Sequence, residues 1–394
     1  MIPKLREAYN QSFQQENYDR FLADIHPKHN ISLDFRIAET PIFANNDFKN
    51  EFLKLFEEVK AMVSQEDFAQ KMEGAVPEKF RVPNENKHPH FIAIDVAVCQ
   101  KENGAFYPQL IELQGVASLY CYQRHLSLAY QKHFSLPKIL TPFLHSSLSH
   151  EAYVEKLKKV IFADNDPENV ILLDIKPKYQ KTRVDFLYTI RDLGIKPVCV
   201  SEVIQEGAQI FYKSQGKKIP VNRIYNRLIF DELERRTDLQ ISFDWKQPTN
   251  AEWVAHPNWF FKLSKYTMPF MESEYVPKTY FLNELEKYPK DLENYVLKPL
   301  FSFAGAGVHY DVTDDILAGI KDTKNYILQK KVSYAPFIPT KDVPAKAEIR
   351  MLCVWDDELT PLITLARLSK GKILGVDFNK DKTWVGSSAV FFES

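Results

Sequence analysis

The sequence predicts a mixed α/β fold, of the α/β class with α+β elements and a central open parallel α/β unit. Apolar residues recur at helical spacing over residues 47–72, and two apolar stretches flank a tight turn over residues 91–114. A strand–helix–strand pattern follows over residues 170–200. Because a helical crossover carries the chain back to the same end of a sheet, the strands of this unit are expected to pair in parallel.

Size and composition indicate a folded protein of two or three packed units. The chain has 394 residues, of which 45% are hydrophobic and 13% aromatic, enough apolar surface to bury several cores. Lysine and arginine number 51 against 52 acidic residues, so the formal charge of -1 gives no overall attraction to nucleic acid or to an anionic membrane. We therefore expect no nucleic-acid partner and a purely local anion site.

The amino-terminal segment and the cysteines favour a cytoplasmic protein. The first ten residues carry Lys4, Arg6 and Glu7 and lack the apolar core of a signal peptide. No apolar run approaches membrane-spanning length. The four cysteines are widely scattered and match no metal-ligand spacing, which disfavours a disulfide framework and structural zinc. We expect no membrane partner; the oligomeric state is left open.

The elements before residue 150 follow from local patterns. Residues 47–72 place apolar side chains on one helical face. The hairpin has strands at residues 91–98 and 107–114, and Glu102-Asn103-Gly104 between them has strong turn chemistry. Ser149 suits the N-cap of a further helix.

The middle unit has a strand at residues 170–174, a helix at 182–193 that Gly194 ends, and a strand at 196–200. The connection Lys176-Pro177-Lys178-Tyr179 has no glycine-rich turn, which disfavours a dinucleotide site. Later in the chain, Lys262 and Lys265 are expected on one helix. The remaining predicted strands cover residues 219–225, 295–299, 326–329, 348–355, 362–368 and 384–392.

The carboxyl-terminal third contains a candidate phosphate site. Lys298 closes an apolar strand and is followed by Pro299 and a glycine-containing loop. An ammonium group beside backbone N–H donors suits a triphosphate, although two glycines in a loop also suit an ordinary hairpin turn. Lys265 provides a second ammonium group. The candidate loop residues are Ser302, Gly305, Ala306 and Gly307.

A strand that turns polar abruptly follows at residues 326–332. Such an edge can present hydrogen-bonding groups to an adenine, and Gln329, Lys330 and Val332 are the candidates.

A candidate metal site lies on the amino-terminal hairpin. Asp95 is on one strand, and Glu112 and Gln114 lie one residue apart on the other, so the latter two share a face. Hard oxygen ligands of this kind suit octahedral magnesium that bridges ATP phosphates. A solvent-facing hairpin edge is the alternative interpretation.

These motifs, with Val276-Pro277 between the two lysines, resemble the nucleotide half of ATP-grasp ligases from about residue 256 to the end. The metal motif, which that family carries last, stands first here. The chain therefore resembles circularly permuted ATP-grasp enzymes, namely glutathionylspermidine synthetases and eukaryotic glutathione synthetases. The resemblance implies three parts: residues 1–150, a helical region with the metal-binding hairpin; 151–255, a Rossmann-like substrate domain; and 256–394, the ATP-binding region.

The resemblance also implies an activity. In the family, a carboxylate attacks the γ-phosphate of magnesium ATP, and an amine captures the acyl phosphate to give an amide. ATP and Mg²⁺ are thus the implied cofactors, and a small-molecule carboxylate and amine the implied substrates. Phosphorylation of a hydroxyl, nucleotide binding without turnover, and a glycosyltransferase built on the middle unit remain alternatives.

Two positions depart from the family pattern. Gln114 stands where the family has Asn, and Ala93 stands where it carries an arginine that steadies the acyl phosphate. Loss of such a charge commonly removes about a hundredfold in rate, so another cation is expected to substitute. The candidates are Arg350 and Arg367, with Arg367 preferred; ion pairs with acids such as Glu348 are the alternative.

Arg227, in Tyr225-Asn226-Arg227, resembles the arginine-bearing strand end of the same family. We expect it to orient a substrate carboxylate or to mark the joint between two domains. Ion pairing with Asp231 or Glu232 is an equal alternative. Asp377-Phe378-Asn379 reads as a solvated turn rather than a metal site.

Overall fold

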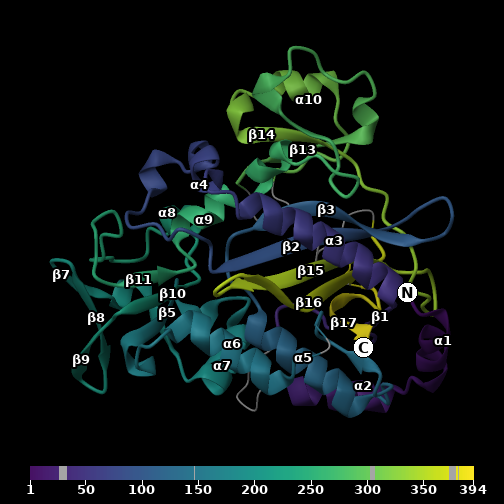
Figure 1. The fold of residues 1–394 in the computed structure, drawn as a ribbon, viewed down its shortest axis with the longest axis horizontal. Helices are drawn as coiled ribbons and strands as arrows, with labels where there is room; N and C mark the ends of the chain where they lie inside the picture. Colours follow the sequence, from purple (N-terminus) through teal and green to yellow (C-terminus); the bar gives the residue numbers. More distant parts are fainter. Residues whose placement is uncertain (26–32, 146, 302–306, 372–378, 380) are drawn as a thin grey trace.

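The computed structural model describes the whole chain except residues 26–32, 146, 302–306, 372–378 and 380. Its described residues form a mixed α/β architecture with several sheets, consistent with an α+β fold (Figure 1). Asp377 and Phe378 lie outside the described residues. None of the helices that can be described is long and apolar enough to cross a membrane.

A seven-stranded sheet joins the two ends of the chain. Its order is β1-β17-β16-β15-β2-β3, with β4 beside β17, and β2 pairs antiparallel with β15. The amino-terminal hairpin therefore lies directly against the carboxyl-terminal strands. The strands are β1 (Ile42–Ala44), β2 (Phe91–Gln100), β3 (Phe106–Gln114), β4 (Leu140–Thr141), β15 (Lys346–Trp355), β16 (Leu359–Ser369) and β17 (Gly386–Glu393).

Helices cover both faces of this sheet (Figure 1). Successive side chains of β2 point to opposite faces, so Ile94 packs with Phe52 of α3 (Asn46–Val63) in one core. Ala93 packs with Tyr120 of α5 (Tyr120–His133) in a second core, which α6 (His150–Phe162) and α7 (Arg183–Leu193) complete. The predicted helix at 47–72 is confirmed as α3 and the short α4, as is the Ser149 cap, whose Oγ accepts from Ala152 N at 3.1 Å. The remaining helices are α1 (Pro3–Ser12), α2 (Gln15–Ile25), α4 (Phe68–Lys71), α8 (Phe230–Glu234), α9 (Pro257–Lys262) and α10 (Asp314–Gly319).

The middle of the chain forms a parallel sheet with the order β11-β10-β5-β6. The predicted strand–helix–strand unit is confirmed, because α7 follows β5, precedes β6 and ends at Gly194 in the left-handed conformation with φ of 74°. The strands are β5 (Val170–Asp174), β6 (Lys196–Cys199), β10 (Arg223–Asn226) and β11 (Glu252–Val254).

The prediction of one strand over residues 219–225 is wrong. Residue 219 belongs to β9 (Lys217–Pro220), which pairs with β8 (Gln209–Ser214), whereas β10 pairs with β5. Pro220 lacks the N–H group that a central strand needs, and the chain changes sheet directly after it. β9 thus completes a small antiparallel sheet with β8 and β7 (Ile204–Glu206).

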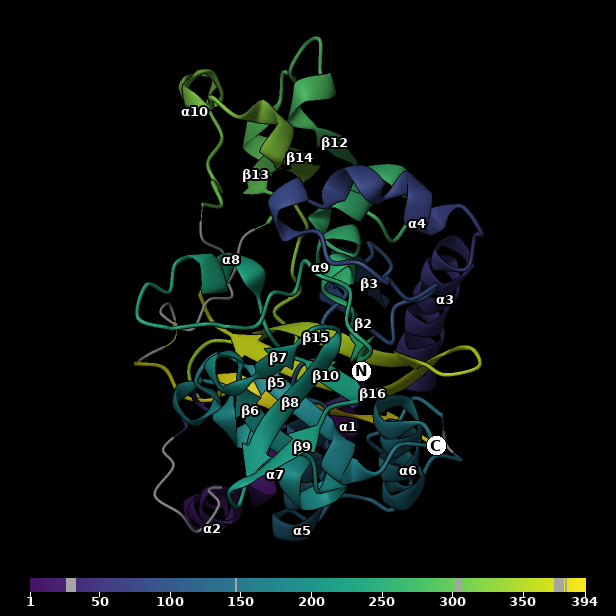
Figure 2. The same ribbon diagram turned by 90° about the vertical axis from the view of Figure 1, so that its left-hand side faces the viewer.

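A separate small lobe projects from the large sheet beside β3 (Figures 1 and 2). We call the described part of residues 279–330 the small lobe. Its antiparallel strands have the order β12-β14-β13, and they share a local core with Leu317 of α10. The strands are β12 (Thr279–Phe281), β13 (Tyr295–Pro299) and β14 (Tyr326–Lys330).

The single helix predicted to carry Lys262 and Lys265 is two elements. α9 ends at Lys262, and Lys265 begins the 3-10 helix η6 (Lys265–Phe270). Ser264 produces the break, because its Oγ accepts a hydrogen bond from Tyr266 N at 3.1 Å and so caps the second element.

Candidate functional site

The pairing of three strands places charged side chains on one face of the large sheet. On the hairpin, Asp95 lies opposite Glu112, and Ala93 lies opposite Gln114. On the other side of β2, Asp95 lies opposite Arg350 of β15. Since directly opposed residues of antiparallel strands share a face, these side chains form one continuous row.

Arg350 holds Asp95 through two parallel hydrogen bonds. Its Nε lies 2.6 Å from Oδ1, and its Nη2 lies 2.6 Å from Oδ2. The Asp95 side chain is only 2% exposed. Burial by itself lowers the pKa of Arg350, but the Asp95 carboxylate outweighs it and raises that pKa above its ordinary value. The pair is therefore a buried, doubly hydrogen-bonded ion pair, the geometry in which a guanidinium binds a carboxylate most strongly.

Gln114 connects the two carboxylates of the hairpin. Its Nε2 donates to Asp95 Oδ2 at 3.2 Å and to Glu112 Oε1 at 2.6 Å. The amide group thus turns its N–H side toward both acids.

Two lysines from the later part of the chain meet the hairpin at Glu112. Lys265, at the start of η6, places Nζ 3.1 Å from Glu112 Oε2. Lys298, on β13, donates to Gln329 Oε1 at 2.5 Å and lies 3.5 Å from Ile111 O, 187 positions away in sequence. The sequence predicted separate roles for these residues in one site, and the fold brings them together.

The electrostatics of this group favour an anionic ligand. Burial by itself raises the pKa of Glu112, but the charges of Lys265, Lys298 and Arg350 outweigh it and hold that pKa at about 2. Burial lowers the pKa of Lys298 to about 8, although Glu112 acts in the opposite direction. Lys298 is thus a desolvated ammonium group that an added negative charge would stabilise.

A further pair continues the row. Arg367 of β16 lies opposite Glu348 of β15, with 3.9 Å between Nη1 and Oε1, and its side chain is 43% exposed. Tyr334 Oη donates to Glu348 Oε2 at 3.4 Å, and burial raises the pKa of Glu348. Arg367 is therefore held loosely and Arg350 tightly. Arg350 is thus bound to Asp95, whereas Arg367, the cation that the sequence favoured as the substitute for the missing arginine, is paired at 3.9 Å with Glu348.

Two of the residues predicted to bind an adenine, Gln329 and Lys330, already form hydrogen bonds within the protein. The Gln329 side chain accepts from Lys298 and donates to Thr279 Oγ1 at 3.2 Å, so it fixes the ammonium group within the small lobe. The Lys330 backbone N–H donates to Lys278 O at 2.8 Å. Val332 is half-buried just beyond β14.

Of the predicted phosphate loop, only Gly307 is described, and Ser302, Gly305 and Ala306 lie outside the described residues. Gly307 has φ of 72°, and a Cβ there would lie 3.2 Å from Pro299 Cγ. Both features favour glycine at this position.

Arg227 is buried at the joint between the parallel sheet and the helical layer. Its Nη1 lies 2.6 Å from Asp185 Oδ2, and the same carboxylate accepts from the backbone N–H groups of Leu119 and Tyr122 at 3.0 and 2.9 Å. The ion-pair partner of Arg227 is thus Asp185 of α7. The sequence had offered Asp231 or Glu232 as that partner.

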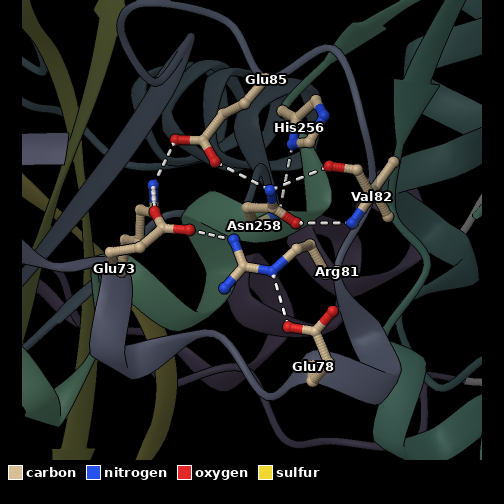
Figure 3. Close-up of polar contacts among 8 residues, drawn as sticks. Glu73, Glu78, Arg81, Val82, Glu85, His256 and Asn258 are labelled. Carbon is tan, nitrogen blue, oxygen red and sulfur yellow. Dashed lines mark hydrogen bonds and ion pairs between the residues drawn. The ribbon is translucent and has the colours of Figure 1, made fainter. Parts of the chain in front are cut away.

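A second polar network, which the sequence did not single out, surrounds α9 (Figure 3). The buried Lys262 ammonium lies 2.6 Å from Glu73 Oε2 and 2.7 Å from Glu85 Oε1. Asn258 bonds both the N–H and the carbonyl of Val82 at 3.0 Å. These contacts fix α9, whose last residue stands three positions before Lys265.

The end of β3 packs on the same helix. Gly115 N donates to Leu263 O at 3.0 Å, and a Cβ on Gly115 would lie 2.0 Å from Trp259 O. Only glycine permits this approach, which sets the spacing between Lys265 and Glu112. No local sequence pattern predicts these contacts, because the contacting residues are far apart in the chain.

The predicted magnesium ligands do not fit a metal ion as arranged here. Asp95 is enclosed and has both oxygens bonded to Arg350, and Gln114 turns its N–H side to both acids. Glu112 is 22% exposed and is paired with Lys265. Among the residues that the structure describes, no group of three or more His, Cys, Asp or Glu side chains could hold a metal ion.

Comparison with known proteins identifies a fold and no family. No family model matches the chain, and no curated protein matches its sequence. Among solved structures, a glutathione synthetase-like effector from Globodera pallida, in its apo form, superposes with a TM-score of 0.63. The match covers 100% of this chain and 98% of that one at 12% sequence identity, so it shows a shared fold alone.

Proposed function

We propose that this chain binds ATP between the small lobe and the β2–β3 hairpin, as a circularly permuted ATP-grasp protein, and uses it as a carboxylate–amine ligase. The observation that carries the proposal is the convergence of Lys265 and Lys298 on Glu112. Three segments far apart in sequence bring charged groups together there, and a desolvated ammonium group stands at a strand end. In this proposal residues 1–150 and 256–394 form the nucleotide-binding part, and residues 151–255 form the substrate domain.

The ligase assignment draws further support from the glutathione synthetase-like effector, whose fold matches this chain from end to end. In the proposed reaction a carboxylate oxygen attacks the γ-phosphorus of ATP, and the bond to ADP breaks. The nitrogen of an amine then attacks the acyl carbon; phosphate leaves, the amine loses a proton, and an amide forms.

The residues of the chain take distinct parts in this scheme. Lys298 and Lys265 neutralise phosphate charge, and Gln329 keeps the Lys298 ammonium in place. Arg367, exposed and loosely paired, can turn toward the transferring phosphoryl group. Arg350 acts through Asp95 and is a positioning residue. Mg²⁺ is the cofactor that the resemblance implies, and because Asp95 is engaged by Arg350, no step is assigned to it.

Nucleotide binding without turnover is a second candidate function. Two specific features favour it: Ala93 removes the arginine that such ligases place beside the acyl phosphate, and Arg350 occupies the carboxylate that would hold a metal ion. Both features reduce catalytic power and leave the cationic groups for binding intact.

The test is ADP release by the purified full chain in the presence of ATP, Mg²⁺ and a panel of amino acids and polyamines. The ligase proposal expects ADP release that requires both a carboxylate and an amine. It also expects Arg367→Ala to lower turnover strongly while it leaves ATP affinity nearly intact, since that side chain acts mainly in the transition state. Binding of ATP without turnover on any pair favours the second candidate, and no ATP binding at all rejects both.

A further inference from the structure

The carboxylate of Asp95 has no free side to offer a metal ion. Arg350 takes both oxygens at 2.6 Å, Gln114 adds a third hydrogen bond at 3.2 Å, and the side chain is 2% exposed. Magnesium binds carboxylate oxygens at about 2.0–2.1 Å and gives up its water reluctantly. An ion at that distance from Asp95 would have to displace the guanidinium or lie close beside a second positive charge.

The backbone itself keeps Arg350 in this position. Arg350 and Asp95 are directly opposed in the β15–β2 ladder, and the pairing runs unbroken on both sides, from Glu348 opposite Ala97 to Leu352 opposite Ala93. The side chain therefore needs no loop movement to reach Asp95, and its arrangement is part of a central sheet.

The rest of the row has a surplus of positive charge. Asp95 and Arg350 neutralise each other, and Glu348 lies beside Arg367. The remaining carboxylate, Glu112, lies 3.1 Å from Lys265 Nζ, and Lys298 Nζ lies 3.5 Å from the carbonyl of the neighbouring Ile111. The four cations and three carboxylates named here sum to one positive charge, and Lys298 among them is desolvated. An anion is thus the ligand that this group lacks.

We infer that this site binds the triphosphate of its nucleotide directly, without a metal ion, and that the Arg350 guanidinium stands at Asp95 where a divalent cation would otherwise stand. The inference rests on the nucleotide site proposed above. Free ATP is more negative than its magnesium complex by the full charge of the ion, so a purely cationic site binds free ATP at least as tightly.

The first experiment uses the unaltered full chain. Calorimetric titration with ATP is run once with excess Mg²⁺ and once with EDTA, at the same ionic strength. The inference expects an affinity in EDTA equal to or higher than that in Mg²⁺. A loss of more than about tenfold in EDTA overturns it and leaves the nucleotide site standing. Absence of ATP binding in both buffers rejects the proposed function and the inference together.

The second experiment removes the guanidinium. Arg350→Gln leaves Asp95 and Glu112 as two neighbouring acids without that cation, so binding of Mn²⁺ alone, followed by electron paramagnetic resonance, is expected to appear in the variant and to be absent from the wild-type chain. Circular dichroism checks that the variant is folded. Stoichiometric Mn²⁺ binding by the wild-type chain, or none by the folded variant, overturns the inference.

A matched control is available within the chain. Arg236 makes the same kind of double contact with Asp238, with Nε 2.7 Å from Oδ1 and Nη2 2.8 Å from Oδ2, at an exposed position. Arg236→Gln removes this guanidinium, while Lys176 Nζ stays 2.5 Å from Asp238 Oδ2, so the variant is a control for the loss of an arginine that is paired with a carboxylate elsewhere in the chain. It is expected to gain no Mn²⁺ binding and to leave ATP affinity unchanged in both buffers. A gain of Mn²⁺ binding equal to that of Arg350→Gln overturns the assignment to the Asp95 site.

Discussion

Replacement of Lys298 by methionine tests the candidate nucleotide site at its most informative residue. Methionine keeps much of the length of the side chain and removes the charge. A hydrogen bond between charged groups contributes about 1.5–3 kcal/mol, so we expect ATP to bind about ten to a hundred times more weakly. Calorimetric titration at pH 7 measures the difference directly.

The same substitution is not expected to unfold the protein. Burial lowers the pKa of Lys298 from 10.5 to about 8, so keeping this ammonium charged in the folded state opposes folding by on the order of 3 kcal/mol at pH 7. Methionine removes that opposing contribution and also removes the hydrogen bond to Gln329. We expect the melting temperature of Lys298→Met to equal or exceed that of the wild type.

The pH dependence gives a second measure of the same group. The free protein loses the Lys298 proton above pH of about 8, whereas bound phosphate favours the charged form and raises the pKa of the ammonium group in the complex. ATP affinity should therefore fall as the pH rises through about 8, and this fall should be absent in Lys298→Met. Lys287→Met, at an exposed position of the same lobe, is the control for general charge loss. Unchanged ATP affinity in folded Lys298→Met would contradict a phosphate-binding role for Lys298.

Three further substitutions test neighbouring parts of the account. Glu112→Gln should strengthen ATP binding in EDTA several-fold, because it removes a negative charge beside Lys265; weaker binding in EDTA would contradict a site that attracts the nucleotide through its cations alone. Arg227→Gln should lower the free energy of unfolding in urea by about 3–5 kcal/mol, because Asp185 is left buried without its ion-pair partner, and a loss below about 1 kcal/mol contradicts that structural role. Burial raises the pKa of Asp174 from 3.8 to about 7, so the folded state binds the proton more tightly and wild-type stability should fall as the pH rises from about 4 through 7. Calorimetry on Asp174→Asn should show that stability no longer falls between pH 4 and 7. The same fall in the variant as in the wild type would contradict the raised pKa of Asp174.

Much of the fold could be predicted because its elements depend on local patterns. The turn at Gly104, the cap at Ser149 and the helix end at Gly194 each depend on the chemistry of one residue and its neighbours. The split of residues 219–225 into β9 and β10 could not be predicted in this way. There the change of pairing partner, from β8 to β5, decides the structure, and neither partner is specified by the residues of 219–225 themselves.

The candidate site also has residues that local patterns predict and contacts that they do not. Lys298 was predicted because it closes an apolar strand before a glycine-containing loop, and Glu112 because it is an acid within an otherwise apolar strand. The contact between Asp95 and Arg350 joins residues 255 positions apart and depends on the register of β2 against β15, which no local pattern specifies. The sequence accordingly predicted a substitute cation and preferred Arg367. The register pairs Arg350 with Asp95, and the role predicted for Arg367 stays a prediction.

The most direct test of the central claim is a crystal structure of the full chain with a non-hydrolysable ATP analogue, grown in EDTA. The account predicts the triphosphate within hydrogen-bond distance of Lys298 Nζ, between the small lobe and the β2–β3 hairpin, with Arg350 still paired to Asp95. A nucleotide bound anywhere else on the molecule, for example at the carboxyl ends of β5 and β10, would contradict it.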